Sequence, residues 1–351
     1  MKRSTVGNVV LAGAVVAASV GGSGRFVRGE RPVDRAPRER SFRLEYRVAL
    51  RELPAGHRVR VWLPVPPSNR DQRVEPLEGH LPACGRTAVE PVYGNTILYF
   101  ETAAPESGTL AFDTVYRVRR REVRGLTRVG TAAPIDAGQR KLFLKPNRRV
   151  PTRGKPIEVL ERLLAGDALP NDPVERARVL FDRVDRLVRY DKSRPGYGRG
   201  DAAWVCDSGF GNCTDFHSLF IAWARANGLP AKFEIGFPLP AEHGEGTIAG
   251  YHCWGYFYAD GRGWIPVDIS EADKHPERRE YFFGNLTENR VAFTVGRDIE
   301  LVPRQASGPL NFFVYPHVEV DGRVWPRSKT GFTLHFVDLP RASTVTDPAS
   351  S

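Results

Sequence analysis

The sequence predicts an α+β protein, because two kinds of hydrophobic periodicity follow one another along its 351 residues. Between about residues 41 and 123, short runs alternate apolar and polar side chains, a pattern typical of half-buried strands. From about residue 155 the apolar residues recur at helical spacing, and strand-like runs return after about residue 230. We therefore expect an all-β N-terminal domain, followed by a domain in which helices pack on an antiparallel sheet.

The N-terminal segment, residues 1–24, has the composition of an export signal. Lys2 and Arg3 precede the apolar stretch "VGNVVLAGAVVAASV", and small residues follow it. The stretch is short for a membrane span, so we expect a signal peptide, with an uncleaved N-terminal anchor as the alternative. The protein is then exported to the periplasm or beyond, and it contacts a membrane only if the segment is an anchor. Residues 25–40 are expected to be a linker, and residues 341–351 a disordered tail.

Residues 41–123 are expected to form a β-sandwich-like domain. Gly, Pro and Asn separate four alternating runs, which read SFRLEYRVAL, HRVRVWLPVP, NTILYFETA and GTLAFDTVYRVRRREV. Alternation with a period of two indicates antiparallel strands that bury one face. This region contains no candidate catalytic residue. Residues 124–155 have weak periodicity and are expected to connect the two domains.

The second domain, residues 156–340, begins with helices. "PIEVLERLLAG" predicts a short helix, and "NDPVERARVLFDRVDRLVRYD" predicts a longer one that starts at an Asn-Asp cap before Pro173. A third helix is predicted from about Cys213 to Asn227, and Gly228 ends it. Strands are predicted at "AKFEIGF", "YHCWGYFYA" and "GWIPVDIS", with "DGRG" as the turn between the last two.

The net charge of +10 does not indicate a nucleic-acid partner. The basic residues are mostly arginines scattered among acidic residues, and the longest basic run is Arg119–Arg121. A nucleic-acid interface requires a concentrated basic face or a known reader motif. We therefore expect a solvated, arginine-rich surface and no nucleic-acid binding.

Three separated residues could form a nucleophilic site. Cys213 is predicted at the N-terminus of a helix, where the free backbone N–H groups and the helix dipole favour a thiolate. His252 lies 39 residues further on in a predicted strand, and Asp268 follows 16 residues after that in the next strand. Neighbouring antiparallel strands can place the histidine beside the aspartate, so that the aspartate orients the imidazole toward the thiol.

The sequence around these residues resembles the transglutaminase-like superfamily. The segments "GNCTDFHSLFIAWARANGLPAKFEIGF" and "GYHCWGYFYADGRGWIPVDIS" contain that family's three motifs in its order: a Cys at a helix start, a His followed by an aromatic residue, and an Asp after "GW-P-D". At these positions this chain has Cys213, His252 with Trp254 two residues on, and Asp268. The resemblance covers about residues 155–285 and implies a papain-like cysteine-enzyme core.

The resemblance implies acyl transfer or amide hydrolysis on a peptide or protein substrate. Cys213 would form a thioester, His252 would act as acid and base, and Asp268 would orient His252. The triad does not distinguish cross-linking from hydrolysis, since both pass through the acyl-enzyme. No calcium-loop pattern occurs, and we expect no cofactor. The alternative is a noncatalytic protein-binding module on the same fold.

Other residues near Cys213 have competing interpretations. Trp204 precedes it in a loop where related enzymes line the acyl site or stabilise the oxyanion, so Trp204 is a candidate site residue, with packing as the alternative. Asp215 and His217 are expected to be structural. His217 and Cys213 could share a zinc ion, with Cys206 and Cys253 as further ligands, but the spacing lacks a tight CxxC pair, and no metal site is expected.

Four cysteines, Cys84, Cys206, Cys213 and Cys253, would be present after export. An even count allows two disulfides in an oxidising compartment, although the fold does not need them. Cys253 follows His252 directly and must point to the other face of the strand. It is therefore expected in the core or in a disulfide with Cys206.

Overall fold

The structure, a computed structural model, describes residues 36–128, 130 and 134–340. The expected export signal at 1–24 and the expected tail at 341–351 lie outside these residues. From Pro37 onward the described chain forms one compact unit. Within the described ranges, no helix has the length and apolar character needed to cross a membrane.

The N-terminal region contributes six strands to two antiparallel five-stranded sheets. These strands are β1 (Glu39–Leu50), β2 (Arg58–Val65), β3 (Gln72–Leu77), β4 (Arg86–Val89), β5 (Thr96–Ala103) and β6 (Leu110–Arg121). Later segments complete the sheets with β11 (Glu245–Ile248), β16 (His317–Val320), β17 (Arg323–Val324) and β18 (Thr330–Asp338). The strand orders are β11-β18-β1-β6-β3 and β17-β16-β2-β5-β4.

The alternation of apolar and polar residues in the sequence corresponds to side chains that point to opposite faces of the strands. On β1, every second side chain is buried: Phe42, Leu44, Tyr46, Val48 and Leu50. β1 pairs along its length with β6 on one side and with β18 on the other. The predicted all-β character of the N-terminal region is therefore confirmed.

The pairing of the last strands differs from the expected domain boundaries. Residues 156–340 were expected to form one domain, but β16 pairs with β2 and β18 pairs with β1. β11, from the middle of that range, pairs with β18 in the same sheet. The chain returns to the N-terminal sheets because β1 and β2 each have an edge that needs a partner.

The remaining residues form the helical and β region of a mixed α+β fold. Its helices are α1 (Ala137–Leu144), α2 (Lys155–Leu164), α3 (Pro173–Leu187), α4 (Ala202–Ser208), α5 (Cys213–Ala226) and α6 (Ile269–Lys274), with 3₁₀ turns at Pro276–Arg278 and Arg327–Lys329. A four-stranded antiparallel sheet has the order β13 (Gly263–Val267), β12 (His252–Ala259), β10 (Ala231–Pro238) and β15 (Arg290–Val295). Two small pairs are β7 (Val123–Arg124) with β14 (Asn285–Leu286), and β8 (Arg189–Tyr190) with β9 (Phe210–Gly211).

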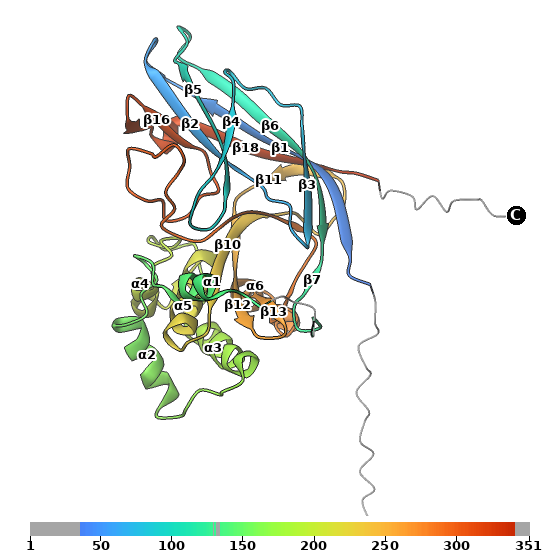
Figure 1. The fold of residues 1–351 in the computed structure, drawn as a ribbon, viewed down its shortest axis with the longest axis vertical. Coiled ribbons are helices and arrows are strands. Elements are labelled where there is room, and N and C mark those ends of the chain that lie inside the picture. The colour runs from blue at the N-terminus through green and yellow to red at the C-terminus, as the bar shows by residue number, and fades with distance from the viewer. Residues whose placement is uncertain (1–35, 129, 131–133, 341–351) are drawn as a thin grey trace, which may run out of the picture. The chain divides into compact units, whose positions relative to one another are not determined.

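Helix α5 is the central element of this region (Figure 1). Every residue from Cys213 to Arg225 is buried. Helices α2, α3 and α4 pack against it, and β10 and β12 contact it as well. A helix buried all round, rather than along one stripe, is held by its whole surroundings, so its first residue is fixed in position.

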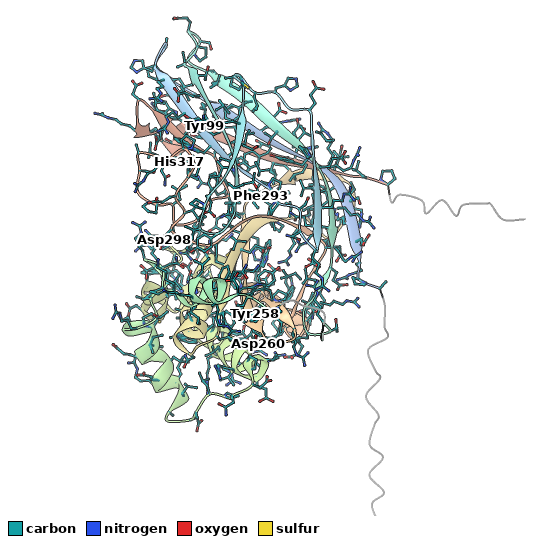
Figure 2. The ribbon with its side chains drawn as sticks, in the orientation of Figure 1. Tyr99, Tyr258, Asp260, Phe293, Asp298 and His317 are labelled. Atoms are coloured by element: carbon teal, nitrogen blue, oxygen red, sulfur yellow. The ribbon has the colours of Figure 1, made fainter. Side chains whose placement is uncertain are left out.

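An aromatic cluster joins the N-terminal sheet to the four-stranded sheet. Phe293 of β15 lies 5.2 Å from Phe237 of β10 and 5.9 Å from Tyr46 of β1, measured between ring centroids. Phe332 of β18 also packs on Tyr46, at 4.6 Å. Phe293 is labelled at the centre of Figure 2. These contacts belong to the large hydrophobic cluster that contains residues of both regions.

Candidate active site

Cys213 is the first residue of α5, as the sequence predicted. The cap is Asn212, whose side chain accepts a hydrogen bond from the N–H of Thr214 at 2.9 Å. The Cys213 side chain is almost completely buried, with the residue 2% exposed. The N-terminal end of a helix favours negative charge, so this position suits a thiolate.

His252 and Asp268 meet at one edge of the four-stranded sheet. His252 begins β12, and Asp268 follows β13 and caps α6 by accepting from the N–H of Glu271. The distance from His252 Nε2 to Asp268 Oδ2 is 2.8 Å, and both side chains are buried. The structure thus brings together the histidine and the aspartate that the sequence singled out.

Cys213 and His252 lie near enough to shift each other's pKa. Burial alone raises the pKa of the Cys213 thiol, but its interactions with Cys253 and with the charge of His252 lower it well below the ordinary value. Burial opposes protonation of His252, but Asp268 and Cys213 outweigh burial and raise the His252 pKa to about 10. Near neutral pH both shifts favour a thiolate and an imidazolium.

Arg290 is a site residue that sequence reasoning missed. Its Nη1 donates to Asp268 Oδ2 at 2.9 Å, and its guanidinium lies 4.9 Å from the centre of the Trp254 ring. Burial alone would raise the pKa of Asp268, but the charges of His252 and Arg290 hold it well below its ordinary range. Arg290 opens β15, a strand far along the chain, and only the sheet pairing could have revealed it.

Tyr251 was also missed, although it directly precedes His252. Its hydroxyl accepts from Asn212 Nδ2 at 3.0 Å and lies 2.8 Å from Thr214 Oγ1. These two hydrogen bonds tie the start of β12 to the start of α5. They hold the segments that carry His252 and Cys213 next to each other.

His217 is a structural residue of α5, as expected. Its Nδ1 lies 2.7 Å from the carbonyl oxygen of Cys213, and its Nε2 accepts from the N–H of Ile269 at 3.1 Å. Nδ1 therefore carries the proton. Burial lowers the pKa of His217, so the imidazole is neutral. With both ring nitrogens engaged, His217 fastens the start of α6 to the first turn of α5.

Asp215 fastens the glycine-rich loop to α5. Its carboxylate accepts from the N–H groups of Gly198 at 2.6 Å, Gly200 at 2.8 Å and Asn212 at 2.9 Å. Burial raises the pKa of Asp215 despite these three donors. Gly198 and Gly200 have φ values of +78° and +58°, a conformation that favours glycine. A Cβ on Gly200 would also lie 2.5 Å from Thr214 Cγ2.

Cys253 lies on the α5 side of β12, opposite to Trp254, as the alternation of a strand requires. Its Sγ lies 3.7 Å from His217 Nδ1 and 3.9 Å from Thr214 Oγ1. Burial, together with the neighbouring Cys213 thiol, raises the Cys253 pKa well above its ordinary value. All four cysteines are free, so the structure contains no bridge between Cys253 and Cys206.

Trp204 lies on α4, and its described contacts are packing contacts. Its ring lies 5.4 Å from the Phe210 ring and 5.5 Å from the Arg199 guanidinium. A Cβ on Gly196 would lie 2.9 Å from the indole. These contacts include none of the three residues of the predicted triad, so a role for Trp204 at the acyl site stays a prediction.

A metal site would require a cluster of ligating side chains, and the sequence predicts none. Across residues 36–128 and 134–340, no three His, Cys, Asp or Glu side chains are grouped as metal ligands would be. Cys206 lies on α4, and burial raises its pKa to about 11. Its neighbour Asp207 pairs with Lys155 at 2.7 Å.

The fold and the buried Cys, His and Asp together define the papain-like class of cysteine-enzyme folds. Residues 162–269 match the family model described as the transglutaminase-like superfamily, a range that includes all three residues. The protein therefore carries a domain of the transglutaminase-like superfamily, as its motifs predicted.

Similarities to three other proteins extend beyond this domain. A Haemophilus influenzae protein described as uncharacterized is 31% identical over 212 residues, which cover 51% of this chain and 57% of the relative. The match therefore spans little more than half of that relative's length.

A structure from Cytophaga hutchinsonii, described as that of a candidate cysteine protease, aligns with a TM-score of 0.50. Its 16% identity over 85% of this chain and 98% of that chain shows a shared fold and no more. The periplasmic domain of TgpA from Pseudomonas aeruginosa aligns with a TM-score of 0.39 at 16% identity, over 69% of this chain and 90% of that chain.

Proposed function

We propose that the protein is a cysteine enzyme that transfers an acyl group from an amide to an amine or to water, on a peptide or protein substrate. One observation carries the proposal: His252 hydrogen-bonds to Asp268 at 2.8 Å, and its imidazole and the Cys213 thiol are near enough to shift each other's pKa. A nucleophile, a base and a group that orients the base thus lie together in one buried site.

In the first step, the Cys213 thiolate attacks the amide carbonyl carbon. Among the described residues, the backbone N–H of Cys213 has no hydrogen-bond acceptor, so it is free to donate to the oxyanion that forms. The imidazolium of His252 gives its proton to the leaving nitrogen, the C–N bond breaks, and an amine departs. The acyl group remains on Cys213 as a thioester.

In the second step, neutral His252 takes a proton from an incoming amine or water. The nucleophile attacks the thioester carbonyl, the C–S bond breaks, and Cys213 leaves as a thiolate beside the restored imidazolium. Asp268 keeps its charge throughout and stabilises the imidazolium. An amine gives a new amide and hence a cross-link, whereas water gives a carboxylic acid.

Thiol labelling tests whether the site is reactive. Iodoacetamide at pH 7 should modify Cys213 far faster than Cys84, the exposed cysteine, and H252A should remove this difference. Labelling is read by mass spectrometry of the peptides. Equally slow labelling of both cysteines, unchanged in H252A, would leave the noncatalytic binding module as the better interpretation.

A glutamine-containing peptide then separates the two reactions. Incubation with and without a primary amine should release ammonia, and C213A should release none. Incorporation of the amine indicates transfer, while glutamate as the only product indicates hydrolysis. If no peptide is turned over although Cys213 is hyper-reactive, the acyl donor belongs to another amide class, which a library of amides would identify.

We also propose that the protein acts after export. The charged start and apolar stretch of residues 1–24 support this location. Fractionation of cells that produce the full chain, with intact-mass measurement, would reveal a shortened exported form. An unshortened protein in the cytoplasmic fraction would contradict export.

A further inference from the structure

A cavity lies away from Cys213, where the N-terminal sheet meets the four-stranded sheet. Its volume is about 500 Å³. β10 contributes Lys232 and Glu234, β12 contributes Tyr256, β13 contributes Trp264, and β6 contributes Arg120. Nothing in the proposed acyl-transfer reaction uses any of these residues.

The cavity opens on the face of the sheet that points away from α5. A Cβ on Gly255 would lie 3.5 Å from Phe220 and 3.7 Å from His217, both on α5. Tyr256 and Tyr258 line the cavity, and in a strand such neighbours of Gly255 must point to the opposite face. Tyr258 is labelled in Figure 2, at the end of β12.

Arg120 carries a buried charge that forms no ion pair with any residue of the described ranges. The residue is 1% exposed, and within the described ranges its Nε and Nη2 have no hydrogen-bond partner. It sits on β6 directly across from Arg40 of β1. Arg40 is equally buried, but Asp338, Asn289 and two backbone carbonyls fully engage its guanidinium. A buried charge without a partner is costly, so Arg120 is poised to bind an anion.

Lys232 is a second cation at the cavity that forms no ion pair with any described residue. Its Nζ lies 4.7 Å from the ring centre of Tyr256 and 4.9 Å from that of Trp264. Arg120 lines the same cavity, so both cations face it.

Basic side chains outnumber acidic ones around the cavity. Asp71 pairs with Arg128, and Glu234 accepts a hydrogen bond from the neutral indole N–H of Trp254 at 3.2 Å, which leaves its charge in place. The wall still has a surplus of positive charge, since Arg70 and Arg262 line it in addition to Arg120, Arg128 and Lys232. A planar guanidinium suits the two oxygens of a carboxylate or a phosphate.

We propose that this cavity binds a small organic oxyanion, with its carboxylate or phosphate on Arg120 and Lys232 and a flat ring against Tyr256 and Trp264. The cations supply the charge that recognises the anion, and the aromatic walls favour a ring over a bare ion. The site is independent of the proposed acyl-transfer reaction, and its loss would leave reactivity at Cys213 in place.

Calorimetric titration of the full-length protein tests the proposal with four probes: acetate, benzoate, inorganic phosphate and phenyl phosphate. Benzoate or phenyl phosphate should bind more tightly than its ring-free counterpart, and the tighter of the two identifies the anionic group. Trp264 fluorescence should change with the same midpoint. If none of the four probes binds at concentrations up to about 10 mM, where even a weak specific site would be occupied, the proposal is overturned.

Substitutions assign the binding to Arg120. R120M should weaken binding by about tenfold or more, as the loss of charged hydrogen bonds requires. R117M changes an exposed arginine of the same strand that pairs with Glu75, and its affinity should stay within about twofold of wild type. R120K keeps the positive charge but loses the planar guanidinium, so it should bind with an affinity between those of wild type and R120M. If R120M fails to fold, R120K serves as the test in its place. Equal affinity in R120M, R120K and wild type would overturn the assignment.

Melting temperature gives an independent readout. Without a ligand, R120M should melt higher than wild type, because a buried charge without a partner has been removed. The preferred probe should raise the melting temperature of wild type but not that of R120M. If R120M melts lower and no probe stabilises wild type, Arg120 is a structural residue and the proposal fails.

Discussion

At the scale of single residues, Cys213 and His252 hold one proton between them in a buried site. The Cys213 pKa is lowered well below its ordinary value, and the His252 pKa is raised to about 10. We expect the alkylation rate of Cys213 to stay nearly constant from pH 6 to 8, because the thiolate persists across this range. An ordinary thiol ionises near pH 8.5, so its rate would rise with every pH unit. Labelling with iodoacetamide, quenched after a series of times at each pH, measures how the alkylation rate of Cys213 depends on pH.

The same measurement on H252A provides the control. Without the imidazolium, the Cys213 thiol loses its main positive neighbour, and its rate at pH 7 should fall by about 30-fold, the factor expected if its pKa returns to about 8.5. The rate should then rise with pH. A flat profile in H252A would mean that the helix N-terminus alone maintains the thiolate.

Asp268 and Arg290 should contribute unequally to stability. D268N leaves the Arg290 guanidinium buried with no other acidic partner among the described residues, and it should cost about 3–5 kcal/mol. R290M leaves Asp268 with His252 and with the N–H of Glu271, so it should cost only about 1.5–3 kcal/mol. Urea unfolding at pH 7 measures both values.

The pH dependence of the free energy of unfolding shows whether the charged form of Asp268 stabilises the fold. Because the pKa of Asp268 is lowered in the folded state, its charge stabilises the protein above the unfolded pKa of about 3.9. This contribution is lost as the pH falls from there toward the folded pKa. The difference between wild type and D268N should therefore be largest between about pH 4 and pH 6.5 and shrink below that range. It should also shrink at higher pH, because Asp268 raises the His252 pKa to about 10 and the stability from protonated His252 is lost as the pH rises toward that value. A difference that grows as the pH falls below about 4 would contradict the assignment.

At the scale of elements, Asp215 connects the glycine-rich loop to the start of α5. D215A removes the acceptor of three buried or half-buried N–H groups, and we expect it to lower the free energy of unfolding by about 2–4 kcal/mol. D201A is the matched control, because Asp201 caps α4 by accepting from only two N–H groups. Its cost should be about 1 kcal/mol. Urea midpoints compare the two, and an equal loss would show that Asp215 acts only as a helix cap.

Whether a site residue could be predicted depends on whether its helix or strand leaves a local pattern in the sequence. Cys213, His252 and Asp268 lie in local motifs with strong cap and strand signals, so the sequence predicted a helix start for Cys213 and neighbouring strands for His252 and Asp268. The structure places Asp268 just after β13, as the cap of α6. Arg290 begins a strand that reads only as apolar, and its pairing with β10 depends on a bulge between Ile235 and Gly236. No local pattern records that contact.

At the scale of the whole molecule, periodicity predicted strands but not their partners. The alternation in β1 is plain in the sequence, yet its neighbour β18 lies almost 300 residues away, with Phe42 opposite Asp338. Either strand could satisfy its hydrogen bonds with many others, and only the common core selects the pair. The expected boundary at residue 156 therefore divided a structure whose first and last strands share a sheet.

This topology predicts that residues 156–340 will not fold alone. In such a fragment β18 would lose β1, which pairs with it from Leu50 opposite Thr330 to Phe42 opposite Asp338. Leu334 and Phe336, now 0% and 2% exposed, would face water, and an exposed apolar edge promotes aggregation. We expect the fragment to be insoluble or to bind a hydrophobic dye, whereas residues 37–340 should give a soluble protein with one cooperative unfolding transition. Solubility, dye fluorescence and urea unfolding of the two proteins decide the question. A soluble 156–340 fragment whose Cys213 is as reactive as in the longer protein would show that the N-terminal sheets are dispensable for the site.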